Sequence, residues 1–129
     1  MENQQTTASV DFDHLLKSNL ERVFNERDDA KRAQAISELF AEHAVMYEPD
    51  QLVEGRAAIS MVAARLLQQF GPAFRFKPEG VGVGHHGMGT LRWTAGNIDG
   101  PVVVQGFDTV EVVDGRIVRL WVLIEKAPS

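Results

Sequence analysis

The sequence predicts an α+β domain in which three N-terminal helices pack on one face of a curved, mainly antiparallel sheet. Two observations predict this class. Apolar residues recur at helical spacing up to about residue 70, with one short strand among the helices. After the Gly-Pro pair at 71–72, β-prone segments alternate with turn residues to the end of the chain. Helices followed by consecutive strands are typical of α+β folds.

Three helices are expected in the first half of the chain. The first begins at Asp11, whose carboxylate can cap the first turn, and runs to about Glu26. A second helix follows the aspartate pair at 28–29 and continues through Phe40, and a third covers residues 57–70. The apolar stripe of the first helix consists of Phe12, Leu15, Leu16, Leu20, Val23 and Phe24.

A short strand is expected between the second and third helices. Residues 44–48 (AVMYE) are β-prone, and Pro49 ends the strand because proline has no amide hydrogen for the ladder. Residues 51–56 are expected to form a loop that leads into the third helix.

Four further strands are expected as an antiparallel meander. The segment AGNIDGP at 95–101 is rich in turn residues, and Asp114–Gly115 is a strong signal for a tight turn. The strands between these signals span residues 74–83, 88–94, 102–113 and 116–125.

The composition is that of one globular domain. The 129 residues, 44% of them hydrophobic, are enough to bury a core, and we expect a single domain over residues 11–129 after a disordered lead-in at 1–10. A net charge of −5 without a basic patch argues against nucleic-acid binding, and no apolar run approaches the length of a membrane span. The polar N-terminus lacks the features of a signal peptide, so a cytoplasmic location is expected. The absence of cysteine excludes disulfides, thiolate catalysis and cysteine metal sites.

Asp108 stands out because it lies in the middle of an apolar strand and not at a turn. Side chains alternate between the two faces of a strand, which assigns the even positions of the last two strands to the core and turns Asp108 inward beside Gly106. A glycine next to a buried acid indicates a pocket, and a buried carboxylate needs partners or a raised pKa. The alternative is that Asp108 caps a loop amide, pairs with a core hydroxyl or is turned outward by a bulge. The even positions of the last strand are Val118, Leu120, Val122 and Ile124.

The odd positions predict a second feature, an apolar stripe on the outer face of the sheet. Phe107, Trp121 and Leu123, with Val103 and Gln105, share that face. Because a contiguous apolar patch on a sheet suggests a partner surface, we expect a homodimer that forms through the sheet face.

The chain resembles the SnoaL-like and ketosteroid-isomerase-like proteins of the nuclear transport factor 2-like superfamily. The resemblance covers about residues 12–126. It rests on three helices with a strand that ends in MYEP, a later strand GFDTVEV and a DGRI turn. It implies a cone-shaped α+β barrel with a deep pocket between the helices and the concave sheet, and dimers through the sheet face.

The resemblance also implies roles for two carboxylates. In the ketosteroid-isomerase branch, the acid before the proline is the base that removes a proton next to a carbonyl, and this position is Glu48. An inward aspartic acid, kept protonated, donates a hydrogen bond to the oxyanion, and this position is Asp108. The branch also has a tyrosine on the first helix, where this chain has Leu20, and this departure argues against steroid isomerisation itself. The only tyrosine, Tyr47, is expected to point away from Glu48.

Two other branches imply different uses of the same positions. In SnoaL-like polyketide cyclases an acidic residue of this sheet is the acid/base for an aldol ring closure without metal or cofactor, and Asp108 is the corresponding candidate. The epoxide-hydrolase branch needs two aspartates and an arginine around a water molecule. Arg92 is the nearest arginine, but strand alternation turns it away from the pocket.

The remaining candidates are expected around the pocket. Trp93 faces inward opposite the Asp108 strand and can form the wall for a flat apolar ligand, although core packing explains it equally well. Of the pair His85–His86, His85 is the one that could reach the pocket rim, and a simple strand-end histidine is the alternative. Neighbouring strand residues point to opposite faces, so the pair is not expected to chelate a metal. The other expected substrate contacts are Leu20, Val104, Leu120 and Val122.

These observations predict a cofactor-independent pocket protein that binds a small apolar carbonyl compound. Glu48 would remove a proton and Asp108 would act as acid or oxyanion donor. The alternatives are a pocket that binds a ligand without converting it, and a non-catalytic binding or dimerisation module, because one fold supports many functions. The deciding observation is whether the two carboxylates share one cavity.

Overall fold

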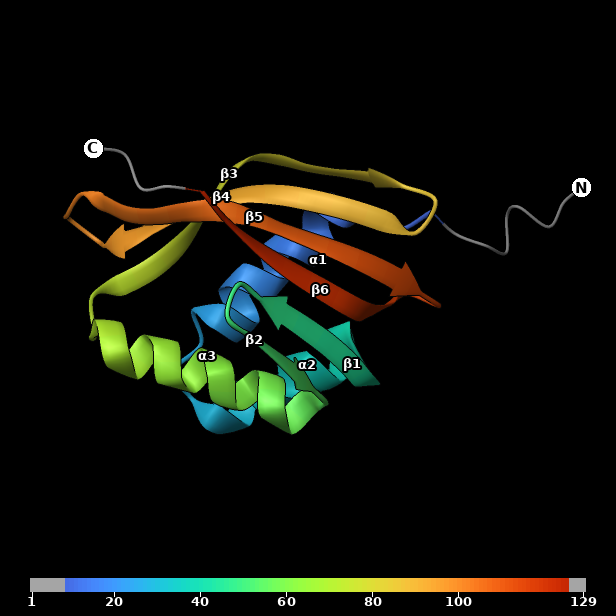
Figure 1. Ribbon diagram of the computed structural model, residues 1–129, viewed down its shortest axis with the longest axis horizontal. Helices are drawn as coiled ribbons and strands as arrows, with labels where there is room; N and C mark the ends of the chain where they lie inside the picture. The colour runs from blue at the N-terminus through green and yellow to red at the C-terminus, as the bar shows by residue number, and fades with distance from the viewer. Residues whose placement is uncertain (1–8, 126–129) are drawn as a thin grey trace, which may run out of the picture.

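The computed structural model describes residues 9–125 and has the predicted α+β architecture (Figure 1). Most of the lead-in expected at 1–10 lies outside the described residues. Four helical segments cover one face of a six-stranded sheet: α1 (Phe12–Asn19), the π-helical turn η2 (Leu20–Phe24), α2 (Asp29–Leu39) and α3 (Arg56–Phe70). None of these helices is long and apolar enough to cross a membrane.

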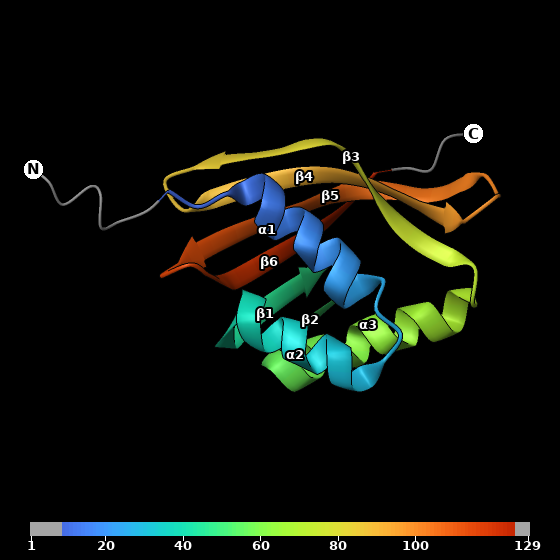
Figure 2. The ribbon, with the colours of Figure 1, turned by 180° about the vertical axis from the view of Figure 1, so that it is seen from behind.

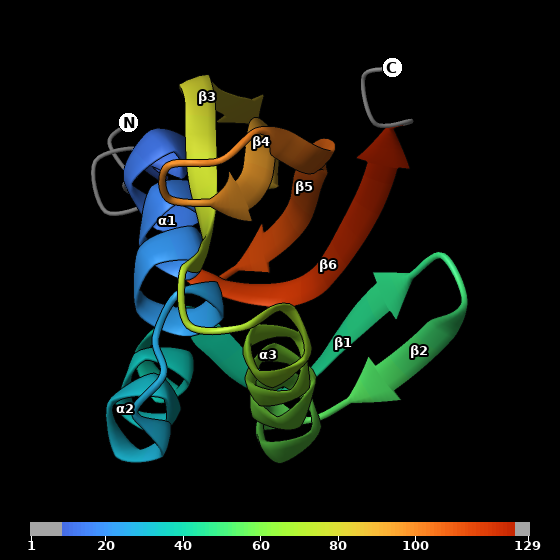
Figure 3. The same ribbon diagram turned by 90° about the vertical axis from the view of Figure 1, so that its left-hand side faces the viewer.

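The sheet is curved and open, with the strand order β2-β1-β6-β5-β4-β3. All neighbouring pairs are antiparallel except β1 and β6, which run parallel. Figure 3 shows the helices inside the curve of the sheet, and Figure 2 shows α1 lying across β3 and β4. The strands are β1 (Phe40–Glu48), β2 (Gln51–Glu54), β3 (Phe74–His85), β4 (Met88–Asn97), β5 (Val102–Val113) and β6 (Arg116–Glu125).

The first helix begins as predicted but does not continue as one α-helix. The Asp11 carboxylate accepts a hydrogen bond from the His14 amide at 3.0 Å, which is the expected N-cap. From Leu20 the chain forms a π-helical turn, in which the Asn25 amide bonds to the Leu20 carbonyl at 2.8 Å. The buried stripe passes through this change and contains Leu16, Asn19, Leu20 and Val23.

Two predicted boundaries between 40 and 56 were wrong. Phe40 begins β1 and does not end the second helix, and residues 51–54 form the strand β2 where a loop was expected. A tight turn at Pro49–Asp50 folds β2 back on β1, with Glu48 opposite Gln51. The proline therefore ends one strand and begins a hairpin.

The glycine-rich hairpin of β3 and β4 receives the start of α1. The pairing of β3 with β4 has a bulge between Glu79 and Val83, a segment that contains Gly80 and Gly82. A Cβ atom at Gly84 or Gly89 would collide with the Phe12 ring, so these two glycines let the helix approach the sheet closely.

The even–odd rule fails near the start of β6. Ile117 and Leu120 are both buried, because the pairing of β5 and β6 shifts by one residue between Glu111 and Val112. Val118, which was expected in the core, is only half-buried.

Candidate functional site

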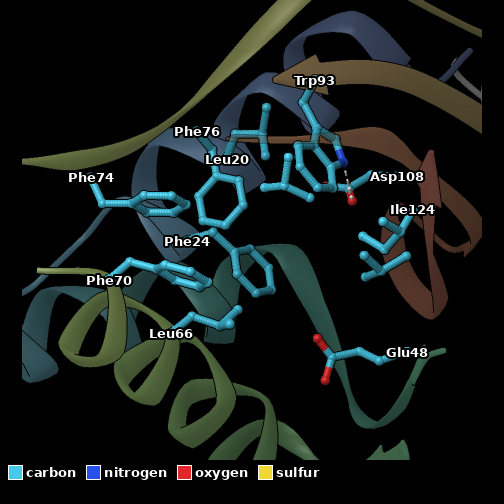
Figure 4. A pocket seen from close by; sticks show the side chains of 12 residues that line it. Leu20, Phe24, Glu48, Leu66, Phe70, Phe74, Phe76, Trp93, Asp108 and Ile124 are labelled. Carbon is cyan, nitrogen blue, oxygen red and sulfur yellow. Dashed lines mark hydrogen bonds between the residues drawn. The ribbon is translucent and has the colours of Figure 1, made fainter. Parts of the chain in front are cut away.

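A cavity of about 170 Å³ lies between the helices and the concave face of the sheet (Figure 4). Every layer of the fold contributes to it: η2 and α3 from the helical side, and all strands except β2 from the sheet. Its lining is apolar apart from two carboxylates. The lining residues are Leu20, Phe24, Glu48, Leu66, Phe70, Phe74, Phe76, Trp93, Val104, Asp108, Val122 and Ile124.

Five aromatic rings form a continuous wall of this cavity. Phe76 is at its centre, with edge-to-face contacts to Phe24, Phe74 and Trp93 at centroid distances of 6.2, 5.4 and 5.3 Å. Phe70 stacks on Phe74 at 4.5 Å. Such a wall suits a flat apolar ligand, because ring faces and edges offer contact area without demanding hydrogen bonds.

The rim of the cavity is formed by the end of α3 and the end of β6. Phe70 and Ile124 are 42% and 47% exposed, although both line the cavity. The guanidinium group of Arg27 fixes this rim by donating to the carbonyls of Leu67, Gly71 and Phe74 at 3.2, 2.7 and 3.1 Å. Phe70 therefore stands on a backbone that Arg27 braces on both sides, at Leu67 and at Gly71.

Asp108 points into the cavity, as strand alternation predicted. It is 4% exposed, and its Oδ1 accepts a hydrogen bond from Trp93 Nε1 at 2.9 Å. Burial raises the pKa of Asp108 to about 7, while Trp93 and Asn19 oppose the rise by favouring the ionised form. A carboxyl group with this pKa populates both protonation states near neutral pH, which suits it to general acid or base catalysis.

Gly106 does not leave the empty volume that was expected beside Asp108. A Cβ atom there would collide with the carbonyl oxygen of Leu123 and would lie 3.1 Å from the Trp93 ring. Trp93 is the cross-strand partner of Gly106. The missing side chain therefore makes room for the indole that bonds to Asp108.

Glu48 lies at the end of β1 and lines the same cavity as Asp108. Figure 4 shows its carboxylate on the opposite side of the cavity, turned towards the interior. Gln51 Nε2 donates to Glu48 Oε1 at 2.6 Å across the β1–β2 hairpin. Tyr47 points to the other face of the sheet, as predicted, and stacks on Trp121 at 5.1 Å. The two predicted catalytic carboxylates thus share one cavity and approach it from different strands.

This arrangement agrees with the comparison to known families. The sequence profile of the SnoaL-like domain matches residues 20–120. The chain belongs to the SnoaL-like family. A search of functionally curated proteins gave no match.

Solved structures support the same assignment. A candidate isomerase of the SnoaL-like family from Agrobacterium tumefaciens is 26% identical, with a TM-score of 0.80 over 87% of this chain and 95% of its own. A candidate ketosteroid isomerase from Kribbella flavida is 17% identical (TM-score 0.69, 92% and 81% covered). A candidate polyketide cyclase from Sinorhizobium meliloti is 19% identical (TM-score 0.64, 84% and 93% covered). The last two show a shared fold.

Not all expected ligand contacts line the SnoaL-like cavity. Leu20, Trp93, Val104 and Val122 do. Leu120 is fully buried in the core and is not a lining residue. Arg92 is outside the cavity, as expected, and pairs with Glu125 at 3.0 Å.

His85, which was expected either at the pocket rim or as a strand-end histidine, does not line the cavity. It lies at the far end of the β3–β4 hairpin. The two histidine side chains were expected to point to opposite faces of a strand, and this was wrong. His86 lies in the turn with a positive φ of 51°, and its Nδ1 is 2.8 Å from Nδ1 of His85. Within residues 9–125, no group of three or more His, Cys, Asp or Glu side chains is placed to hold a metal ion.

The sequence interpretation missed Asn19 and most of the aromatic wall. Asn19 is fully buried on α1 and lies close enough to Asp108 to influence its ionisation. A signal was present, since Asn19 is a polar residue within the apolar stripe of the helix. Phe70, Phe74 and Phe76 were assigned to elements, but their convergence depends on how α3 and β3 meet.

Proposed function

We propose that this protein is a cofactor-independent isomerase or cyclase that performs carboxylate acid/base chemistry on a small apolar carbonyl compound. The observation that carries the proposal is the presence of Glu48 and Asp108 in one otherwise apolar cavity. Glu48 is the proposed base, and Asp108 the proposed acid or oxyanion donor.

The proposed reaction begins with proton transfer. The Glu48 carboxylate removes a proton from the carbon next to the carbonyl group. The electron pair of that C–H bond forms a C=C bond, and the π pair of the C=O bond moves to the carbonyl oxygen. Protonated Asp108 donates a hydrogen bond to this oxygen and stabilises the developing enolate. Return of the proton from Glu48 to another carbon of the conjugated enolate gives an isomer. Attack of the enolate carbon on a second carbonyl closes a ring instead; the π pair of that carbonyl moves to its oxygen, which takes the proton from Glu48. Both outcomes balance without a redox partner.

Three observations support this chemistry over other uses of the fold. The pKa of Asp108, raised to about 7, keeps a protonated fraction at neutral pH. The aromatic wall suits a planar enolate, and the named structural relatives are candidate isomerases and a candidate cyclase. The absence of tyrosine from α1 favours substrates other than steroids.

The test combines a ligand screen with two carboxylate variants. Cyclic enones, steroids and polyketide mimics are screened for thermal stabilisation, because a ligand of the folded state raises the unfolding temperature. For a compound that is also converted, Asp108→Asn and Glu48→Gln should each lower kcat about 10²- to 10⁴-fold with folding intact.

Glu42→Gln is the matched control, because Glu42 is exposed on the same strand as Glu48. It should retain full activity. Unchanged turnover in Asp108→Asn would show that Asp108 has only a structural role, and would contradict its proposed role as acid or oxyanion donor.

The second candidate function is ligand binding without conversion. It is favoured by the absence of a tyrosine donor on α1 and by the hydrogen bond that Gln51 donates to the proposed base. Stabilisation by a ligand that is never converted, and that Glu48→Gln binds equally well, would decide for this function. The cytoplasmic location stays a prediction from the sequence.

A further inference from the structure

Asn19 is the most unusual buried residue outside the carboxylate pair. Its side chain has no solvent exposure, and neither Oδ1 nor Nδ2 has a hydrogen-bond partner among residues 9–125. It sits at the end of α1 on the inner stripe between Leu16 on α1 and Val23 on η2, which are also fully buried. An unpaired amide in such a place is costly, because its polar atoms have lost water and gained nothing in return.

The neighbour of this amide is the Asp108 carboxyl group. Asn19 lies beside Asp108 and lowers its pKa, without reaching hydrogen-bond geometry. The other polar neighbour, Trp93, donates to Oδ1 of Asp108. Three polar side chains from α1, β4 and β5 therefore meet inside an apolar core.

The three groups differ in the hydrogen bonds that they can make. An indole is a donor only, so Trp93 can donate a hydrogen bond to one carboxyl oxygen of Asp108 in both the ionised and the protonated state. An amide carries both a donor and an acceptor. Asn19 can thus face an ionised oxygen with Nδ2 and a protonated one with Oδ1.

We propose that Asn19 is a positioning residue for Asp108: its amide donates to the carboxylate when Asp108 is ionised, and it accepts the single O–H of protonated Asp108 until a ligand oxygen takes over that hydrogen bond. Rotation of one buried amide then accommodates the loss or gain of a proton. The inference deepens the proposed function and rests on it in one respect, that Asp108 is the group that exchanges a proton.

Few other groups can influence this proton. Glu48, which enters from β1, is the only other titratable side chain among the cavity-lining residues. The cross-strand neighbours of Asp108 are Leu91 on β4 and Val122 on β6, which are apolar. Asn19 and Trp93 are the two neutral side chains that shift its pKa.

The experiment follows the proton on Asp108 without any substrate. The indole Nε1–H resonance of Trp93 is recorded against pH in a Trp121→Phe background, which leaves a single tryptophan. This resonance should titrate with a midpoint near neutral pH, and Asp108→Asn should abolish the titration. Asn19→Leu should move the midpoint up by about one pH unit, because the ionised form loses a donor.

Two further variants separate positioning from packing. Asn19→Ser restores a donor and an acceptor and should return the midpoint towards the wild-type value. Ser18→Ala, the neighbouring residue on α1, should leave it unchanged.

An unchanged midpoint in Asn19→Leu would overturn the proposal. If that variant does not fold, the side-chain amide resonances of Asn19 in the unaltered protein decide: they should follow the Trp93 midpoint and lose their pH response in Asp108→Asn. Amide resonances that do not respond to pH would equally overturn it. Because no step needs turnover, a failed search for a substrate and a failed role for Asn19 remain distinguishable.

Discussion

Burial of Asp108 links the stability of the domain to pH. The pKa of this carboxyl group is raised from 3.8 to about 7 in the folded protein, chiefly by burial. Between these values the folded state holds a proton that the unfolded chain has released. The contribution of Asp108 is therefore fully present below about pH 4 and is lost as the pH rises through 7.

This loss can be measured by comparison with Asp108→Asn, which mimics the protonated form. The free energy of unfolding of the wild type should fall by about 3 kcal/mol relative to the variant between about pH 4.5 and pH 8. Urea denaturation of both proteins at each pH provides the values, and other carboxylates cancel in the difference. Parallel pH profiles would show that Asp108 does not change its protonation on unfolding.

Individual residues differ in how far the sequence revealed them. The inward direction of Asp108 and Trp93 followed from strand alternation alone, and their hydrogen bond confirms it. Gly106 was correctly placed on the inner face of the sheet. The prediction that it leaves an empty volume beside Asp108 was wrong, because the Trp93 ring occupies that space. Which side chain fills a gap depends on packing between strands, which no local pattern encodes.

At the scale of an element, the lack of a side chain at Gly106 allows atoms of β4 and β6 to pack directly against the backbone of β5. Both neighbours press against this position, β6 with the Leu123 carbonyl and β4 with the Trp93 ring. Gly106→Ala should destabilise the fold by about 1–3 kcal/mol, because the backbone must shift to admit a methyl group. It should also disturb the Trp93–Asp108 hydrogen bond.

Denaturant unfolding and the pH titration of Trp93 check this expectation. Val103→Ala is the control on the same strand, since Val103 is 49% exposed and should cost less than about 1 kcal/mol. A fully stable Gly106→Ala variant with an unaltered titration would contradict the close packing at this glycine.

Most elements were predictable because their signals are local. The Asp11 cap, the turn at Asp114–Gly115 and the alternation of β5 each depend on a few neighbouring residues. The strand β2 was missed because Pro49 marks the end of one strand equally well whether a loop or a hairpin follows. The π-helical turn and the bulge between β5 and β6 carry no distinctive residue pattern.

On the scale of the whole molecule, the outer face of the sheet stays a predicted dimer interface. Cross-strand register places Leu52 beside Tyr47, and Tyr47 beside Trp121, so the stripe extends to β2. Leu123, opposite Phe107, is 50% exposed on the same face. An exposed apolar area of this kind is typical of a partner surface.

Leu123→Glu should convert a dimer into a monomer, because it buries a charge in the proposed interface. Analytical ultracentrifugation over a range of concentrations measures the change. Met61→Glu provides the control, since Met61 is 52% exposed on α3, away from the sheet. A wild-type protein that sediments as a monomer throughout the range would rule out this interface.

The parallel pairing of β1 with β6 affects when the cavity can form during folding. Residues 45–47 pair with residues 119–121, so within the sheet the β1–β2 hairpin that carries Glu48 joins the β3–β6 meander that carries Asp108 through β6. Contacts between such distant parts of a chain form late in folding, because a long loop must first close. During synthesis, the two carboxylates can share a cavity only after β6 has left the ribosome. A shortened or partly folded chain would contain both acids, but not the site that they form together.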